Sequence, residues 1–345
     1  MRIIAFLMSF LSIFALWNVH MQPNCIPETR VAPVDSDGAM PDRFGIWPTE
    51  EFTEGQAPWW FSPLATRQYY NLKGLFNGGR HAYSLLVLYQ GELVYEWYDE
   101  AFDETTRFNV ASVTKNVLAT LVGIAIYEDY IECLDQNIID FFPEAEELLA
   151  PDSNKRDMTI DHLLTMTSGL EDLSGWQPSD GGLAAFLQPQ LHAPGRRFSY
   201  DFVTYNLLAA VVSRATGQPL HDFAQAYLFE PLGITSVDHW PQWEGGNYIG
   251  SGGMLMAPRD MLRLGYFWLN YGRWEDAQLL CPHFIAQAAP RSMAPVAYGR
   301  SFWNNWPLFF FTNSFEASGV GGQFITVSPR MGMVVVRTGG SVSAN

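Results

Sequence analysis

The chain has 345 residues, of which 48% are hydrophobic and 15% aromatic, and its formal net charge is −16. This length and composition predict a folded chain with a sizeable core and exclude a disordered one. The negative charge argues against nucleic acid and anionic membrane surfaces as partners, because both would repel the chain. The seven histidines are scattered, and the three cysteines form no metal-binding spacing, so the sequence implies no metal and no cofactor.

The N-terminal segment, MRIIAFLMSFLSIFALWNVH, combines one early arginine with an apolar stretch. The stretch spans roughly fifteen residues, which suits a signal-peptide core better than a full membrane span. We therefore expect residues 1–20 to be a signal peptide or an N-terminal anchor, which would be the only contact with a membrane. This expectation implies an exported protein of the periplasm or cell envelope, secreted or anchored. Residues 21–79 are expected to form an irregular lead-in.

Two β-hairpins are predicted near opposite ends of the chain. The stretch AYSLLVLYQGELVYEWY, residues 82–98, contains two β-rich runs joined at Gln90 and Gly91. The stretch GGQFITVSPRMGMVVVRTG contains two more, which turn around Ser328, Pro329 and Arg330. Strands at both ends with helices between them predict one sheet that both ends of the chain complete.

Helices are predicted between the hairpins. The stretch ASVTKNVLATLVGIAI, residues 111–126, is apolar over most of its circumference and should be a helix buried nearly all round. From about 135 to 290, Gly- and Pro-rich loops separate further helices, one closed by Gly217 and one with Pro258 in its first turn. We expect an α+β fold whose sheet comes from residues 80–105 and 295–340.

A lysine stands in the first turn of the most apolar helix. Ser112 is a suitable N-cap, but the position three residues on, where a capping box has Glu or Gln, holds Lys115. A cation there opposes the positive end of the helix dipole, so folding does not account for it. Residues i and i+3 share a helix face, which carries the lysine amine over the serine hydroxyl.

This pair predicts nucleophilic catalysis. Burial and the helix N-terminus both disfavour the charged lysine, so the pKa of Lys115 should fall. A neutral amine can accept the proton of the Ser112 hydroxyl and make it a nucleophile, while free N–H groups at the helix start can stabilise an oxyanion. The alternative is that Ser112 is only an N-cap and that the lysine extends to solvent.

Four stretches in chain order carry a family resemblance: FNVASVTKNVLATLVGIAI, MTIDHLLTMTSGL, PGRRFSYDFVTYNLLAAVVSRATGQPL and SGGMLMAPRDMLRLGYFWLNYGRW. Together they resemble the beta-lactamase-related serine hydrolases. That family includes class C beta-lactamases, D-alanyl-D-alanine carboxypeptidases, carboxylesterases and 6-aminohexanoate-dimer hydrolases. The likeness covers roughly residues 80–338. It implies a beta-lactamase/transpeptidase-like fold, an antiparallel sheet flanked by helices with an all-helical subdomain, here about 135–290, within a hydrolase domain of residues 80–345.

The resemblance also implies roles for individual residues. Ser112 corresponds to the nucleophile and Lys115 to the lysine of the Ser-x-x-Lys motif. Tyr200, in the stretch YDF, corresponds to the tyrosine of a Tyr-x-Asn motif, with Tyr205 as a nearby competitor. A buried ammonium beside this phenol is expected to lower the pKa of the phenol, so that it shares proton transfer with the lysine. The N–H groups of Ser112 and Val320 would form the oxyanion hole.

Two departures from the family pattern concern substrate binding. Phe202 replaces the Asn of Tyr-x-Asn, and the third motif, Lys/His-Thr/Ser-Gly, falls on Ala317, Ser318 and Gly319. These four residues are the predicted substrate-binding positions. The loss of an amide and of a cation implies a more apolar pocket with less affinity for an anionic substrate.

The sequence therefore predicts a serine hydrolase that acts on a small molecule. It would cleave a small ester or a short linear amide through a covalent acyl-Ser112 intermediate. Two alternatives remain open: a beta-lactamase or D-alanyl-D-alanine carboxypeptidase, and a non-catalytic binding or sensor homologue.

Overall fold

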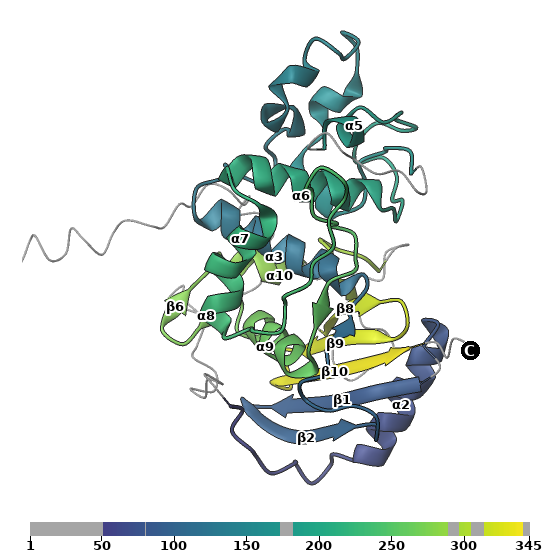
Figure 1. Ribbon diagram of the computed structural model, residues 1–345, viewed down its shortest axis with the longest axis vertical. Coiled ribbons are helices and arrows are strands. Elements are labelled where there is room, and N and C mark those ends of the chain that lie inside the picture. Colours follow the sequence, from purple (N-terminus) through teal and green to yellow (C-terminus); the bar gives the residue numbers. More distant parts are fainter. Residues whose placement is uncertain (1–50, 80, 173–181, 289–296, 305–313, 341–345) are drawn as a thin grey trace, which may run out of the picture. The chain divides into compact units, whose positions relative to one another are not determined.

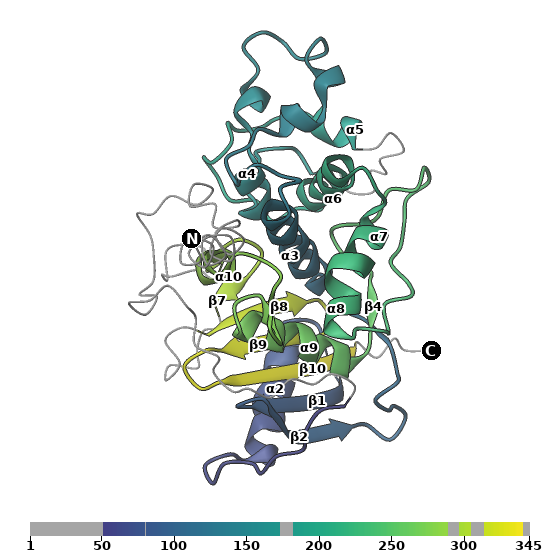
Figure 2. The same ribbon diagram turned by 90° about the vertical axis from the view of Figure 1, so that its left-hand side faces the viewer.

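The computed structural model of the protein describes residues 51–79, 81–172, 182–288, 297–304 and 314–340. Figures 1 and 2 show these ranges in colour. The predicted signal peptide or anchor, residues 1–20, lies outside the described residues. Among the helices of the described ranges, none is long and apolar enough to cross a bilayer.

A six-stranded antiparallel sheet, in the order β2-β1-β10-β9-β8-β7, is the main β structure. Its strands are β1 (His81–Tyr89), β2 (Glu92–Tyr98), β7 (Trp303–Asn304), β8 (Phe315–Gly319), β9 (Gln323–Ser328) and β10 (Met333–Gly340). Both predicted hairpins are confirmed. β1 turns into β2 through Gln90 and Gly91, whose φ angles of 52° and 88° match a turn that needs two left-handed residues. The pairing of β1 with β10 confirms that both ends of the chain complete one sheet.

Alternate residues of the sheet face two different helical layers. Leu86 and Leu88 of β1 join the main core together with α3 (Val113–Tyr127) and α9 (Pro258–Leu269). Leu85 and Val87 join a smaller core beneath α2 (Pro63–Phe76). The period of two along a strand produces this division, and Figures 1 and 2 show α9 and α2 on the two sides of the sheet.

The helix α3 is buried along nearly its whole length, as its uniform hydrophobicity predicts. Every residue from Val113 to Ala125 is buried, so the helix contacts neighbours on all sides. A helix so enclosed has its N-terminus fixed by packing.

The helical segment between the hairpins is narrower than the predicted range of 135–290. It consists of η2 (Ile138–Phe141), η3 (Pro143–Ala145), η4 (Asn154–Asp157), α4 (Ile160–Leu164), α5 (Leu183–Phe186), α6 (Val203–Thr216), α7 (Leu220–Ala224), the π-helical η5 (Gln225–Phe229) and α8 (Glu230–Leu232). Gly217 closes α6 with a φ of 68°, as predicted.

Short strands lie within that range as well. They are β4 (Leu255–Met256), which pairs with β3 (Phe108–Asn109), and the pair β5 (Arg273–Trp274) and β6 (Ala277–Gln278); the helix α10 (Pro282–Ala288) follows. The helix α9, with Pro258 in its first turn as predicted, packs on the sheet and belongs to the sheet layer.

The prediction that residues 21–79 form an irregular lead-in is wrong for residues 63–76. The helix α2 begins where the Ser62 hydroxyl accepts a hydrogen bond from the Ala65 N–H, with Pro63 in the first turn. Only Tyr70 and Gly74 of this helix are buried. Leu64, Leu72 and Leu75 are exposed, so most of the leucines of this helix lie away from the face that packs on the sheet.

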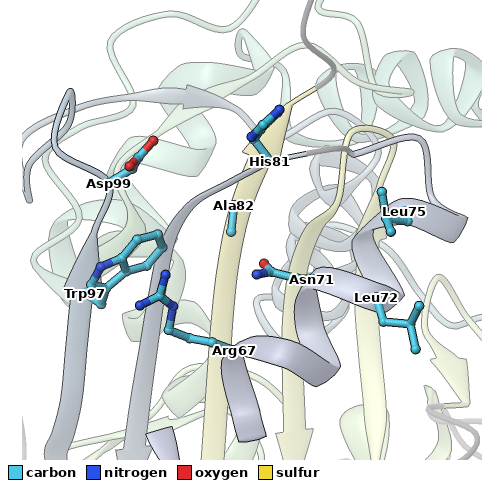
Figure 3. A pocket seen from close by; sticks show the side chains of 8 residues that line it. All are labelled: Arg67, Asn71, Leu72, Leu75, His81, Ala82, Trp97 and Asp99. Atoms are coloured by element: carbon cyan, nitrogen blue, oxygen red, sulfur yellow. The ribbon is translucent and has the colours of Figure 1, made fainter. Parts of the chain in front are cut away.

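A groove of about 370 Å³ lies on the α2 side of the sheet, between α2 and the strands β1 and β2 (Figure 3). Its lining residues are Arg67, Asn71, Leu72, Leu75, His81, Ala82, Trp97 and Asp99. None of the residues predicted for catalysis lines this groove, so the groove and the candidate active site are separate.

Candidate active site

The start of α3 presents Ser112 in an unusual conformation for an N-cap. Its φ and ψ of −70° and −4° are helical, and Ala111 before it has a φ of 48°. Within the described residues, the Ser112 side chain makes no capping hydrogen bond. The alternative that Ser112 serves only as an N-cap is therefore wrong, and its hydroxyl is available for other contacts.

Lys115 lies one turn into the helix and is only 1% exposed. Its Nζ is 3.2 Å from the Ser112 Oγ and 2.5 Å from the Ser251 carbonyl oxygen. The Ser251 N–H in turn donates to the Asn206 Oδ1 of α6 at 3.1 Å. A neutral amine that gives one N–H to the Ser251 carbonyl has its lone pair free for the Ser112 proton.

Three aromatic rings surround the amine. The Lys115 Nζ is 4.9 Å from the ring centroid of Tyr200, 5.2 Å from that of Phe202 and 5.8 Å from that of Tyr205. Burial lowers the pKa of Lys115 to about 7, against the opposing charges of Asp201 and Asp172. This lowered pKa agrees with the predicted fall and makes the neutral amine accessible near neutral pH.

Tyr200 lies beside the pair, with its ring centroid 4.9 Å from the Lys115 Nζ, and its interaction with Ser112 favours a lower pKa of the phenol. The prediction that its pKa is lowered is wrong: burial raises the pKa of Tyr200, and the negative charge of Asp201 raises it further. The phenol is therefore protonated at neutral pH. The competitor Tyr205 instead donates its hydroxyl to the Leu164 carbonyl at 3.0 Å, inside the core.

Asp201 is a buried carboxylate that the sequence analysis did not single out. It accepts hydrogen bonds from the Thr204 N–H at 2.7 Å and the Thr204 hydroxyl at 3.0 Å, and so caps α6. Burial raises the pKa of Asp201 to about 6. Its place just before the predicted helix was the available signal, because Asp is a favoured capping residue. The cap fixes Tyr200 and Phe202 at the entrance to the helix.

The strand β8 brings its end against the start of α3. A Cβ on Gly319 would lie 2.4 Å from the Val110 carbonyl oxygen and 3.1 Å from the Ser112 nitrogen, so only glycine fits there. Val320 follows and is 68% exposed. Among the described residues, neither the Ser112 N–H nor the Val320 N–H has a hydrogen-bond acceptor.

The side chains of Ala317 and Ser318 do not lie where the family pattern places substrate contacts. Ala317 is 0% exposed in the main core, and the Ser318 hydroxyl accepts a hydrogen bond from Asn77 of the α2 layer at 3.0 Å. Alternation along β8 turns the two side chains to opposite faces, so that Ala317 is enclosed in the core while Ser318 is half-buried. Phe202, by contrast, is 54% exposed beside the lysine.

An aromatic group that the sequence analysis did not identify extends the site beyond Tyr200. The Tyr200 ring lies 5.7 Å from that of Trp303 and 5.9 Å from that of Tyr298. Trp303 and Tyr298 are 4.6 Å apart, and Phe198 lies 5.4 Å from Tyr298. These residues come from separate loops and from β7, so no local pattern in the sequence could have joined them.

The described ranges contain no group of three or more His, Cys, Asp or Glu side chains that could hold a metal ion. The charged groups next to the site are the carboxylates of Asp201 and Asp172 and the amine of Lys115. The buried amine 3.2 Å from the Ser112 hydroxyl is suited to proton transfer.

Comparison with known proteins assigns the family. The model of the Beta-lactamase family matches residues 60–338, and the chain therefore belongs to the beta-lactamase family of serine hydrolases. Esterase EstB of Burkholderia gladioli is 32% identical over 151 residues, which are 38% of this chain and 38% of the esterase. The chain spans between 30% and 38% of the length of the curated relatives it matches.

Solved structures show the same fold. The "Putative 6-aminohexanoate-dimer hydrolase" of Bacillus anthracis has a TM-score of 0.65 and 19% identity, with 85% of this chain and 82% of the other covered. A penicillin-binding protein homologue from Caulobacter crescentus has a TM-score of 0.61 and 18% identity, with coverages of 84% and 94%. The expected beta-lactamase/transpeptidase-like α+β fold is thus confirmed.

The buried lysine predicts an inactive variant that is more stable than the wild type. In Lys115→Met, an apolar side chain of similar length replaces an amine that the fold must hold uncharged at a cost. Between pH 7 and 10 the unfolded wild type binds more protons than the folded one, so wild-type stability rises with pH. We expect the melting temperature of Lys115→Met to exceed that of the wild type at pH 7, with the difference shrinking toward pH 10.

Calorimetry across this pH range measures the difference, with Ser112→Ala as the control for loss of the hydroxyl alone. A melting temperature of Lys115→Met that lies below the wild type at pH 7 would contradict the expected cost of burying the amine.

Proposed function

We propose that the protein hydrolyses a small ester or a short linear amide through a covalent acyl-Ser112 intermediate. The observation that carries this proposal is the buried Lys115 amine, 3.2 Å from the Ser112 hydroxyl and nearly out of reach of solvent. A base with a pKa near 7 matches the operating pH of a general base.

Acylation would proceed by attack of the Ser112 Oγ on the substrate carbonyl while its proton passes to the Lys115 amine. The oxyanion would be received by the N–H groups of Ser112 and Val320, which have no acceptor among the described residues. Collapse breaks the bond to the leaving group, which takes a proton from the protonated Tyr200 hydroxyl. The Lys115 ammonium then restores that proton, and water releases the acyl group by the reverse transfers.

The surroundings favour a substrate without a carboxylate. Ala317 stands where the family pattern has a cation, and it is buried, while Phe202 stands in place of an amide. The carboxylates of Asp201 and Asp172 act on the lysine and would repel an anionic substrate. Rings of Tyr200, Phe202 and Trp303 offer apolar contact instead.

The names of similar proteins support the same class. EstB is named an esterase, and the Bacillus anthracis structure is named a "Putative 6-aminohexanoate-dimer hydrolase". The Caulobacter crescentus neighbour is named a penicillin-binding protein homologue, which keeps beta-lactam or D-alanyl peptide chemistry as the second candidate.

Labelling by a fluorophosphonate probe tests the nucleophile. The wild type is expected to label and Ser112→Ala to remain unlabelled, because no other serine has an amine held against its hydroxyl in the described site. The wild type should also hydrolyse p-nitrophenyl butyrate and leave nitrocefin intact. Labelling that survives in Ser112→Ala would overturn the nucleophile, and rapid nitrocefin turnover would favour the beta-lactam candidate.

The pH dependence of ester hydrolysis measures the apparent pKa of the proposed general base, Lys115. Since only the neutral amine accepts the proton, kcat/KM should rise with pH and level off above an apparent pKa of about 7. Asp201→Asn removes a negative charge that raises the pKa of Lys115, so the midpoint should move to lower pH. Stopped-flow or steady-state rates with p-nitrophenyl butyrate give both midpoints. A rise in rate centred near pH 10 would be inconsistent with a buried lysine base.

A further inference from the structure

The N–H of Val320 belongs to the same peptide unit as the Gly319 carbonyl, and that carbonyl is held from the far side of the sheet. We propose that Asn77 is a positioning residue that aims the Val320 N–H at the oxyanion formed during acylation. This inference rests on the proposed hydrolysis at Ser112 and adds a residue that no motif of the family resemblance includes.

Asn77 forms hydrogen bonds with the chain on both sides of Val320. Its Nδ2 donates to the Gly319 carbonyl oxygen at 2.8 Å and to the Ser318 hydroxyl at 3.0 Å. Its backbone carbonyl accepts the Gly321 N–H at 2.9 Å. Three hydrogen bonds from one residue thus restrain the turn between β8 and β9.

Because the peptide unit is planar, holding the Gly319 carbonyl also fixes the direction of the Val320 N–H. In a trans peptide the C=O and N–H groups point in opposite directions. Because the Gly319 carbonyl points to Asn77 in the α2 layer, the Val320 N–H points away from it. The end of β8 that carries this N–H lies against the start of α3, since a Cβ on Gly319 would be 3.1 Å from the Ser112 nitrogen. The bond to the carbonyl also polarises the amide, which makes its N–H a stronger donor.

The loop that carries Asn77 fits the turn closely. A Cβ on Gly79 would lie 2.1 Å from the Gly321 carbonyl oxygen, so the two backbones are in direct contact. Lys73, one turn before Asn77, forms an ion pair with Glu316 of β8. The helix α2 is therefore fastened to β8 at two levels, which fixes where the Asn77 amide sits.

The Asn77 side chain is not needed to end its own helix. Its backbone N–H satisfies the Gly74 and Leu75 carbonyls at the C-terminus of α2. Its side-chain amide is thus directed entirely at β8. Substitution of the side chain should leave α2 intact and release the Gly319 carbonyl.

The test measures kcat and KM for p-nitrophenyl butyrate in Asn77→Ala and in Asn77→Asp, which keeps the shape but removes the donor. Removing an oxyanion-hole donor outright costs about 100- to 1,000-fold in kcat. Loss of its orientation should cost about 10- to 100-fold, with KM changed less than about twofold, because the contact strengthens only in the transition state. Fluorophosphonate labelling of Ser112 should slow by a similar factor.

Ser62→Ala is the matched control. This substitution removes the N-cap of α2, in which the Ser62 hydroxyl accepts a hydrogen bond from the Ala65 N–H. It should lower the stability of the protein without changing the turn between β8 and β9. Its kcat should equal that of the wild type below its melting temperature. If Ser62→Ala loses kcat as Asn77→Ala does, the effect is only structural and the inference fails.

Two further outcomes separate this inference from the proposed function. If both Asn77 variants keep kcat within about twofold while Ser112→Ala is inactive, the inference is wrong and the hydrolase stands. If the wild type neither labels at Ser112 nor hydrolyses the ester, the proposed function fails, and this inference fails with it.

Discussion

The burial of the Lys115 amine against the Ser112 hydroxyl is the constraint around which the site is arranged. A primary amine with 1% of its surface exposed is strongly disfavoured as a cation, so the fold holds it with a pKa of about 7. The surrounding helix provides the apolar packing that makes this burial possible. Such a group lowers the stability of the fold, and buried groups with strongly shifted pKa values cluster at functional sites.

Three segments that are distant in sequence meet at this amine. The start of α3 provides Ser112 and Lys115, the entrance to α6 provides the aromatic rings and Asp201, and the end of β8 provides Gly319. A fourth segment, just before β4, contributes through its backbone, since the Ser251 carbonyl accepts a hydrogen bond from the amine. The sheet and the helical segment share one core, so the segments are held in place by packing.

Local features of this site could be predicted from the sequence, because they depend only on helix and turn geometry. The i, i+3 spacing placed Lys115 over Ser112, and the turn residues placed both hairpins. The helix α2 was missed, and its leucines are exposed instead of being packed in the core. The predicted direction of the Tyr200 pKa shift was wrong because burial and the charge of Asp201 outweigh the lowering effect of Ser112.

Contacts between distant segments could not be predicted. The burial of Ala317 and the contact of Ser318 with Asn77 follow from which face of β8 meets which helix, and a motif match does not specify that. Asn77 itself lies in a region that the sequence predicts to be irregular. Its relation to Gly319 exists only because α2 packs across the sheet.

Direct titration of the Lys115 side chain tests the account most simply. The chain contains three lysines, Lys73, Lys115 and Lys155, so NMR of the ε-carbons in lysine labelled with ¹³C can be assigned with one substitution at a time. If the amine is buried as described, the Lys115 signal titrates near pH 7, and the signal is lost in Lys115→Met. A Lys115 signal that titrates near pH 10.5, as a lysine in water does, would contradict the claim of a neutral amine poised against Ser112.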